Sequence, residues 1–124
     1  MSTSQSYNVL VVDDDYAIRD MLTMFLEEEG FNAVCATNGR EAIDLLRSAA
    51  DQPRVVLLDL NMPVMTGWEF RQEQQHDPAI ANVPVAVISA DRSIVQQPTI
   101  DAEEYFPKPL DLDRLLAFIQ QCCD

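Results

Sequence analysis

The strongest strand signal in this chain is Val55-Val56-Leu57-Leu58-Asp59-Leu60, residues 55–60, followed by the turn Asn61–Gly67. A continuous rather than alternating apolar run is typical of a strand buried on both faces of a sheet. A second run of this kind, Asn8–Val12, ends in the aspartates Asp13–Asp15. Both runs bring carboxylates to the end of a buried strand, and this pattern decides the fold prediction.

Short apolar runs predict three more strands along the chain. They are Phe31–Ala36, Val83–Ser89 and Tyr105–Lys108. The stretches between the strands carry apolar residues at helical spacing. Strands that alternate with helices predict repeated βα units, and right-handed crossovers then give a parallel sheet with helices on both faces.

Four segments carry the helix signals. The first holds Ile18, Met21, Leu22, Phe25 and Leu26 and closes at Gly30; the second follows Asn38, holds Ala42, Ile43, Leu45, Leu46 and Ala49, and ends before Pro53. The third, Trp68–His76, has little apolar face beyond Trp68 and Phe70. Asp111 is expected to cap a last helix that carries Leu112, Leu115, Leu116 and Ile119. Residues 91–100 are the least regular, because Pro98 would break a long helix there.

Length and composition limit the possible classes of protein. The 124 residues are 48% apolar and fit one compact domain, residues 8–124, after a loose polar tail, residues 1–7. The net charge of −13 argues against direct nucleic-acid binding and favours cations or a basic partner surface. No apolar run approaches the roughly 20 residues of a membrane span, and residues 1–8 lack an export-signal core, so the cytoplasm is the expected location.

Three cysteines are present, and their odd number argues against a disulfide framework. Cys35 lies in an apolar run and is expected to be a small core residue. Cys122 and Cys123 are adjacent, and either simple packing or metal binding and oxidation would fit them.

Polar side chains follow four of the predicted strands at their carboxyl ends. They are Asp13–Asp15, Asp59, Ser89 and Lys108. Ligands of open parallel sheets bind outside these ends, so the side chains should share one cleft. Clustered carboxylates raise one another's pKa unless a cation lies among them, and Mg²⁺ takes such oxygen ligands. A carboxylate can also attack a phosphoryl group, whose charge Mg²⁺, a lysine and a hydroxyl would stabilise.

At these strand ends the sequence resembles the CheY-like receiver domains of response regulators. The matching segments are residues 9–14 (VLVVDD), 57–67 (LLDLNMPVMTG), 88–90 (ISA) and 108–109 (KP). They stand in family order over nearly the whole chain. The resemblance implies a flavodoxin-like, doubly wound sheet of five parallel strands in the order 2-1-3-4-5.

The resemblance also implies a role for each matched residue. Asp59 would accept the phosphoryl group, and Ser89 and Lys108 would contact its oxygens. Mg²⁺, or Mn²⁺ in its place, would bind Asp14, Asp59 and the backbone carbonyl of Asn61, with Asp13 acting through water. Ser89 and Tyr105 would form the conformational switch, and the Lys108–Pro109 peptide bond would be cis.

Simpler interpretations of single residues remain open. Asp15 falls beyond the matched pair and is expected to be a solvated loop residue. Tyr105 could be an ordinary core aromatic, and Lys108 a surface lysine. His76 is expected on the surface, and Trp68 in helix packing.

Two departures from the family pattern bear on signalling. The segment between Ser89 and Lys108 is short and lacks the usual Gly-Ala before the fifth strand, so the fourth helix is expected to be short, distorted or missing. The polar third helix is the other departure, and it could mark a partner contact.

The sequence therefore predicts a stand-alone response regulator receiver. Its expected partners are a histidine kinase or phosphotransfer protein and a downstream protein, and a homodimer is possible. It would catalyse only its own phosphorylation and dephosphorylation and would not be a turnover enzyme. One rival is a docking pseudo-receiver that needs no phosphorylation. The other is a metal-dependent phosphohydrolase, against which Asn61 counts because it stands where an Asp-x-Asp motif would need an acid.

Overall fold

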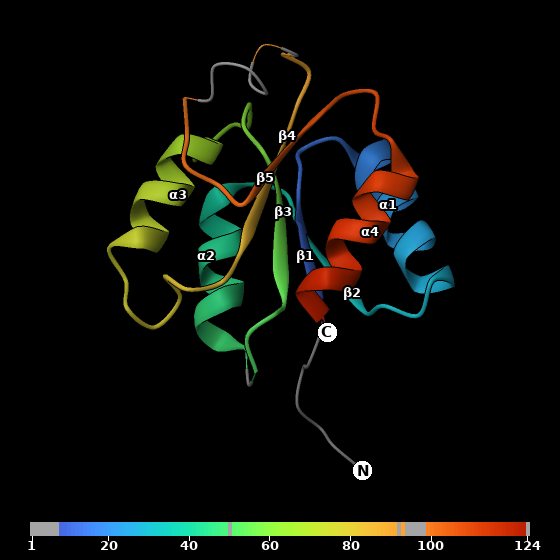
Figure 1. Ribbon diagram of the computed structural model, residues 1–124. Helices are drawn as coiled ribbons and strands as arrows, with labels where there is room; N and C mark the ends of the chain where they lie inside the picture. The colour runs from blue at the N-terminus through green and yellow to red at the C-terminus, as the bar shows by residue number, and fades with distance from the viewer. Residues whose placement is uncertain (1–7, 50, 92, 94–98, 124) are drawn as a thin grey trace.

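A computed structural model describes residues 8–49, 51–91, 93 and 99–123 of the chain. Its centre is a parallel sheet of five strands in the order β2-β1-β3-β4-β5 (Figure 1). The strands are β1 (Val9–Val12), β2 (Ala33–Ala36), β3 (Val55–Asp59), β4 (Val85–Ser89) and β5 (Glu104–Pro107). The doubly wound fold and the strand order expected from the sequence are both confirmed.

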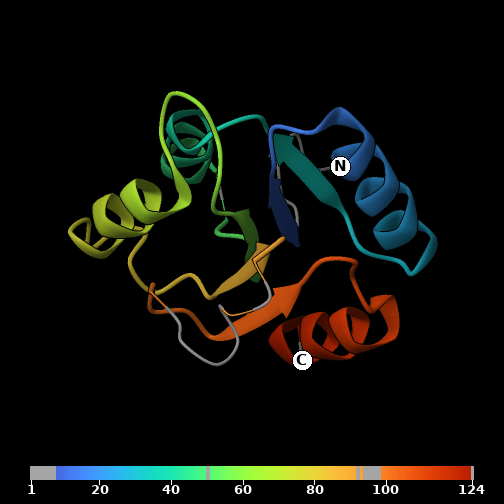
Figure 2. The ribbon, with the colours of Figure 1, turned by 90° about the horizontal axis from the view of Figure 1, so that it is seen from above.

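Helices cover both faces of the sheet (Figure 2). They are α1 (Tyr16–Glu28), α2 (Gly39–Ser48), α3 (Gly67–Gln75) and α4 (Leu112–Cys123). Helices α1 and α4 lie on one face, and α2 and α3 lie on the other. Each face has its own apolar core, one holding Leu22, Leu26, Leu115 and Ile119, the other holding Ile43, Leu46 and Phe70. Strands β1, β3 and β4 are buried throughout because both faces are covered.

The strand register brings the carboxyl ends of the central strands together. Val12 of β1 pairs with Leu58 of β3, so the next residues of the two strands, Asp13 and Asp59, lie side by side. Asp59 in turn pairs with Ile88, which places Ser89 one step further along β4. The residues that the sequence singled out therefore meet at one edge of the sheet.

Side-chain caps fix where the helices begin. Asn38 accepts from Glu41 N at 2.9 Å, and Asp111 accepts from Arg114 N at 3.1 Å. Thr66 and Glu69 form a reciprocal capping box at the start of α3. Asp15 is exposed as expected, but it is more than a solvated loop residue: its carboxylate caps α1 by accepting from Ala17 N at 2.9 Å.

Several predicted boundaries were wrong by one or two residues. Strand β2 begins at Ala33 and not at Phe31, and β4 begins at Val85 and not at Val83. The carbonyl of Val83 is instead bonded to the side chain of Gln74 at 2.9 Å. Between β4 and β5, the described residues 90–91, 93 and 99–103 form no α-helix. The remainder of the expected fourth helix, residues 92 and 94–98, and the predicted tail, residues 1–7, lie outside the described residues.

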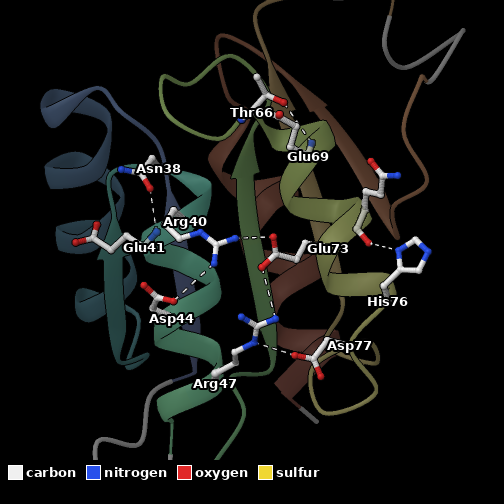
Figure 3. Close-up of polar contacts among 11 residues, drawn as sticks. Asn38, Arg40, Glu41, Asp44, Arg47, Thr66, Glu69, Glu73, His76 and Asp77 are labelled. Carbon is white, nitrogen blue, oxygen red and sulfur yellow. Dashed lines mark hydrogen bonds and ion pairs between the residues drawn. The ribbon is translucent and has the colours of Figure 1, made fainter.

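Polar contacts attach helix α3 to the rest of the protein, and its sequence pattern did not predict them. Phe70 is buried, but so are Arg71 and Gln74. On the side towards α2, Glu73 pairs with Arg40 and Arg47, and Arg47 also reaches Asp77 at 2.8 Å (Figure 3). The polar character of α3 therefore serves contacts within the chain.

Among the described residues, no helix is both long and apolar enough to cross a membrane.

Candidate functional site

Three carboxylates converge at the carboxyl ends of β1 and β3. Asp13 and Asp14 follow β1, and Asp59 is the last residue of β3. One carboxylate oxygen from each residue lies within 4.8 Å of those of the other two. Asp13 and Asp59 are buried, at 2% and 6% exposure, whereas Asp14 is exposed and opens the cluster to solvent. We call these three residues, together with Lys108, the acidic pocket.

Lys108 brings the one ammonium of the pocket from the end of β5. Its Nζ lies 3.4 Å from Asp13 Oδ2 and 3.9 Å from Asp59 Oδ1. The side chain is only 25% exposed, so it is no freely solvated surface lysine. The Lys108 N–H donates to Ser89 O at 2.8 Å, which fixes this residue against β4.

One ammonium does not balance three carboxylates in a buried site. Burial raises the pKa of Asp59 to about 6, and the charges of Asp13 and Asp14 act in the same direction. Lys108 and a backbone hydrogen bond from Asn61 oppose this rise in pKa. The carboxylate of Asp59 is therefore mainly ionised at neutral pH, but it is held in a state that further positive charge would stabilise.

The backbone around the carboxylates is tightly packed. A Cβ on Gly67 would lie 2.8 Å from Asp59 O and from Leu60 Cα, so only glycine fits against the end of β3. Gly67 N also donates to Leu60 O at 2.9 Å. The sequence had marked Gly67 as a turn residue, whereas its close approach to β3 depends on the tertiary structure.

Asp13 is held in place by two contacts from α1 and its cap. Asp15 N donates to Asp13 Oδ1 at 2.9 Å, and Arg19 donates to the Asp13 carbonyl at 2.8 Å. Sequence reasoning missed Arg19. Its position one turn into a helix gives no signal that the guanidinium turns back towards the strand end.

Ser89 and Tyr105 occupy neighbouring strands beside the pocket. Ser89 is 1% exposed, and its Oγ accepts from Asp91 N at 3.1 Å. Tyr105 is half-buried, and its hydroxyl donates to Ile100 O at 2.6 Å and accepts from Ala102 N at 3.0 Å. The aromatic ring packs on the α2–α3 side of the sheet. The Lys108–Pro109 peptide bond is cis, the geometry that the resemblance implies.

The donor set of the pocket fits a hard divalent cation. Asp13, Asp14 and Asp59 form the one group of three or more metal-binding side chains found in the described part of the chain. Carboxylate oxygens, with water in the remaining positions, are the ligands that Mg²⁺ takes in proteins. The cation would also supply the positive charge that the pocket lacks.

The remaining candidates from the sequence lie elsewhere. Cys35 is half-buried, with its Sγ 3.1 Å from Thr23 Oγ1, and Cys122, in the last turn of α4, packs against the core. Burial raises the pKa of the Cys122 thiol, which keeps it protonated at neutral pH. His76 is exposed, as expected. Trp68 is 39% exposed and so is less packed than predicted; its indole N–H donates to Thr99.

A parallel sheet in the order 2-1-3-4-5, with an acidic pocket and a lysine at its carboxyl edge, defines the class of CheY-like receivers. A family model described as the response regulator receiver domain matches residues 9–120. This chain belongs to that family.

Curated relatives agree with this assignment. The chain is 37% identical over 112 residues to the response regulator MprA of Mycolicibacterium vanbaalenii, covering 88% of this chain and 47% of the relative. The chain thus spans about half the length of the MprA relatives it matches. It is also 32% identical over 128 residues to a protein of Leptolyngbya boryana known as the uncharacterized 14.6 kDa protein in the sodA1 3′ region, covering 99% of this chain and 95% of that protein.

Solved structures show the same fold. Chemotaxis protein CheY4 of Vibrio cholerae has a TM-score of 0.81 and 29% identity, over 94% of this chain and 98% of that one. Response regulator TrrA of Thermotoga maritima, in complex with Mg²⁺–BeF, has a TM-score of 0.81 and 28% identity, over 94% and 99% of the two chains.

Proposed function

We propose that this receiver accepts a phosphoryl group on Asp59 from a histidine kinase or phosphotransfer protein, in a reaction that depends on Mg²⁺ or Mn²⁺. The observation that carries the proposal is the acidic pocket, in which Asp59 lies 3.9 Å from the ammonium of Lys108 and beside two further carboxylates. The solved relative TrrA, whose complex holds Mg²⁺ and a beryllium fluoride, supports the same assignment.

In this proposal each side chain has one task. An ionised oxygen of Asp59 attacks phosphorus while the bond from phosphorus to the donor imidazole breaks, and the imidazole keeps the electron pair. Lys108 and the Ser89 hydroxyl donate to the phosphoryl oxygens, where negative charge gathers. Asp14, Asp59 and the Asn61 carbonyl would hold the cation, with Asp13 bound to it through water. The cation would neutralise charge on the carboxylates and on the transferred group.

The raised pKa of Asp59 is compatible with this role. At pH 7.5 a carboxyl group with a pKa of about 6 is mainly ionised, so the nucleophile is available. Ionisation leaves excess negative charge in a buried place, and this favours the binding of a cation before the donor arrives.

Phosphorylation would then shift an equilibrium between two surface states. Ser89 and Tyr105 would move together, because a hydroxyl drawn towards the phosphoryl group vacates space beside the ring. The domain would regulate its partners and would not release a product of its own beyond inorganic phosphate.

We also propose that this receiver works without a fused output domain, through contacts with other proteins. The support is the Leptolyngbya boryana relative, 95% of which is matched by this chain, in contrast to the longer MprA proteins. An antibody against this chain should detect, in cells that express it, one band at the size of a single receiver domain. A markedly larger band would contradict this part of the proposal.

The test of the chemistry is intact mass spectrometry after incubation with acetyl phosphate, with and without Mg²⁺. The wild type should gain one phosphoryl group only with the cation, and Asp59→Asn should gain none. Asp44→Asn, which changes an exposed aspartate of α2, is the matched control and should behave as the wild type. An adduct that persists in Asp59→Asn would mean another acceptor, and no adduct in the wild type would favour a pseudo-receiver that only docks.

A further inference from the structure

A short stretch of chain before β5 is held by three side chains, two from α3 and one from β5. Its residues are Thr99–Ala102, and we call it the anchored segment. The Tyr105 hydroxyl bonds to Ile100 O at 2.6 Å and to Ala102 N at 3.0 Å. From α3, Arg71 Nε donates to Asp101 O at 2.7 Å, and Trp68 Nε1 donates to Thr99 Oγ1 at 2.9 Å. The segment therefore connects the side chain of Tyr105 with the first two turns of α3.

Arg71 is the unusual member of this arrangement. Its side chain is 93% removed from solvent, at 7% exposure. Within the described part of the chain it forms no ion pair with a carboxylate; its fork instead donates to the Asp101 carbonyl and to Gln74 Oε1, the latter at 2.8 Å. A buried guanidinium is costly unless its donors are satisfied, and its planar fork fixes the direction of each bond. Arg71 thus links α3 to the anchored segment in a fixed geometry.

Gln74 connects Arg71 to the backbone that follows the C-terminal end of α3. Its amide group donates to Ile80 O at 3.0 Å and to Val83 O at 2.9 Å, just before β4. Arg71 therefore rests on a side chain that is itself fixed by two backbone carbonyls. Movement of the anchored segment must be transmitted to α3 or must break the bond from Arg71.

The register of the sheet links this arrangement to the acidic pocket. Val87 of β4 pairs with Tyr105 of β5. Side chains alternate along a strand, so Ser89, two residues beyond Val87, points to the same face of the sheet as Tyr105. That face is the one covered by α2 and α3. Tyr105 lies between the serine that would contact the phosphoryl group and the segment that α3 holds.

We propose that Arg71 is a positioning residue for Tyr105, and that the anchored segment couples the position of Tyr105 to the start of α3. The inference rests on the proposed function. Tyr105 can leave its present place only if it gives up two hydrogen bonds or carries the anchored segment with it. Because Arg71 and Trp68 hold the segment, we expect the second course, in which movement of the segment changes the surroundings of α3 at Trp68.

The test uses beryllium fluoride with Mg²⁺ as a phosphoryl mimic and Trp68 as the reporter. Trp68 is the single tryptophan of the chain, so its emission has one source. Adding Mg²⁺ alone gives the baseline, and adding beryllium fluoride should then change the emission of the wild type. Binding itself is followed separately by the fluorine NMR signal of the bound mimic.

Two variants remove hydrogen bonds that hold the anchored segment, and a third serves as a control. Tyr105→Phe and Arg71→Met should still bind the mimic, with a midpoint lowered by about tenfold and threefold respectively, because bonds that hold the unswitched state are gone. In both variants the Trp68 response should be lost. Arg47→Met removes another arginine that contacts α3; its ion pairs, among the described residues, are with Glu73 and Asp77, and this variant should keep the wild-type midpoint and response. Arg71→Lys keeps the charge and serves where Arg71→Met does not fold.

A double-mutant cycle tests the same contact without the mimic. Tyr105→Phe changes the unfolding equilibrium constant by some factor, and that factor should be at least about threefold smaller in the Arg71→Met background than in the wild type. Equal midpoints and responses in all variants, the same losses in Arg47→Met, or an additive cycle would overturn the inference. A wild type that gives no signal for bound mimic would contradict the proposed function instead, and the cycle would then still decide whether Arg71 positions Tyr105.

Discussion

The acidic pocket and the contact between α3 and the anchored segment both bury polar groups, but only in the second are these groups satisfied by their partners. In the pocket, three carboxylates share one ammonium, and burial raises the pKa of Asp59 to about 6. At α3, Arg71 donates to the Asp101 carbonyl and to Gln74 Oε1, and the Gln74 amide donates to two further backbone carbonyls. The pocket is left short of positive charge, whereas the α3 contact is satisfied.

The different treatment of buried polar groups matches a different role for each region. An under-compensated set of charges costs stability but is ready for a cation and a phosphoryl group. A satisfied buried network contributes to stability and fixes geometry. Removing charge from the pocket should therefore stabilise the fold, and removing polar groups from α3 should destabilise it.

The largest effect is expected for a change of a cation ligand in the pocket. Asp14→Asn should weaken Mg²⁺ binding by about 100-fold, because one full negative charge is lost from a site of few ligands. Titration calorimetry measures this affinity. Asp15→Asn is the matched control, since it removes the neighbouring charge and asparagine still caps α1. An equal loss of affinity in the two variants would mean that Mg²⁺ responds only to the general charge of the surface.

The second effect tests the satisfied region. Gln74→Leu should lower the free energy of unfolding by about 2 kcal/mol, because the carbonyls of Ile80 and Val83 and the Arg71 guanidinium each lose a partner. Urea denaturation measures the change. Gln75→Leu, on the exposed side of α3, should stay within about 0.5 kcal/mol of the wild type. A neutral or stabilising Gln74→Leu would remove the contrast between the two regions.

The third effect has the opposite sign and depends on pH. Because the folded-state pKa of Asp59 is raised from 3.8 to about 6, the folded protein binds this proton more tightly than the unfolded chain. Stability is therefore lost as pH rises from about 4 through 6. Asp59→Asn does not titrate, so at pH 8 without Mg²⁺ it should be more stable than the wild type by about 1–2 kcal/mol.

Urea denaturation across pH 4–8 in a chelator measures this difference. The advantage of Asp59→Asn should vanish near pH 4 and be complete above about pH 6.5, as the raised pKa of Asp59 requires. Asp44→Asn should show no such pH dependence. If Asp59→Asn were instead less stable at pH 8, Lys108 would compensate Asp59 fully and the pocket would resemble the α3 region.

The smallest effect concerns the loop between β3 and α3. Val64 has a φ of 69°, and Met65 N donates to Pro63 O at 2.7 Å, which together form a tight turn that a β-branched residue adopts at a cost. Val64→Gly should raise the free energy of unfolding by about 0.5–1 kcal/mol, because glycine adopts a positive φ without the steric cost of a β-branched side chain. Thermal unfolding measures the change, and a less stable variant would mean that Val64 makes a contact worth more than its strain.

Local sequence patterns were enough to predict the strands of the sheet, its two covered faces and the residues of the acidic pocket. Buried strands such as Val55–Asp59 read as unbroken apolar runs, and the side chains that follow them must gather at one edge because all five strands are parallel. These properties are local, so a pattern of a few residues carries them.

The contacts that hold α3 and the residues before β5 join distant parts of the chain, and local sequence patterns did not predict them. Arg71 and Asp101 are thirty positions apart, and so are Arg47 and Asp77; nothing in either local pattern indicates the partner. The close approach of Gly67 to β3 and the turn of Arg19 back to Asp13 depend likewise on where two elements meet. Side-chain bonds to distant backbone groups follow no sequence period. For this reason the sequence of α3 indicated a polar helix but not the partners of its polar side chains.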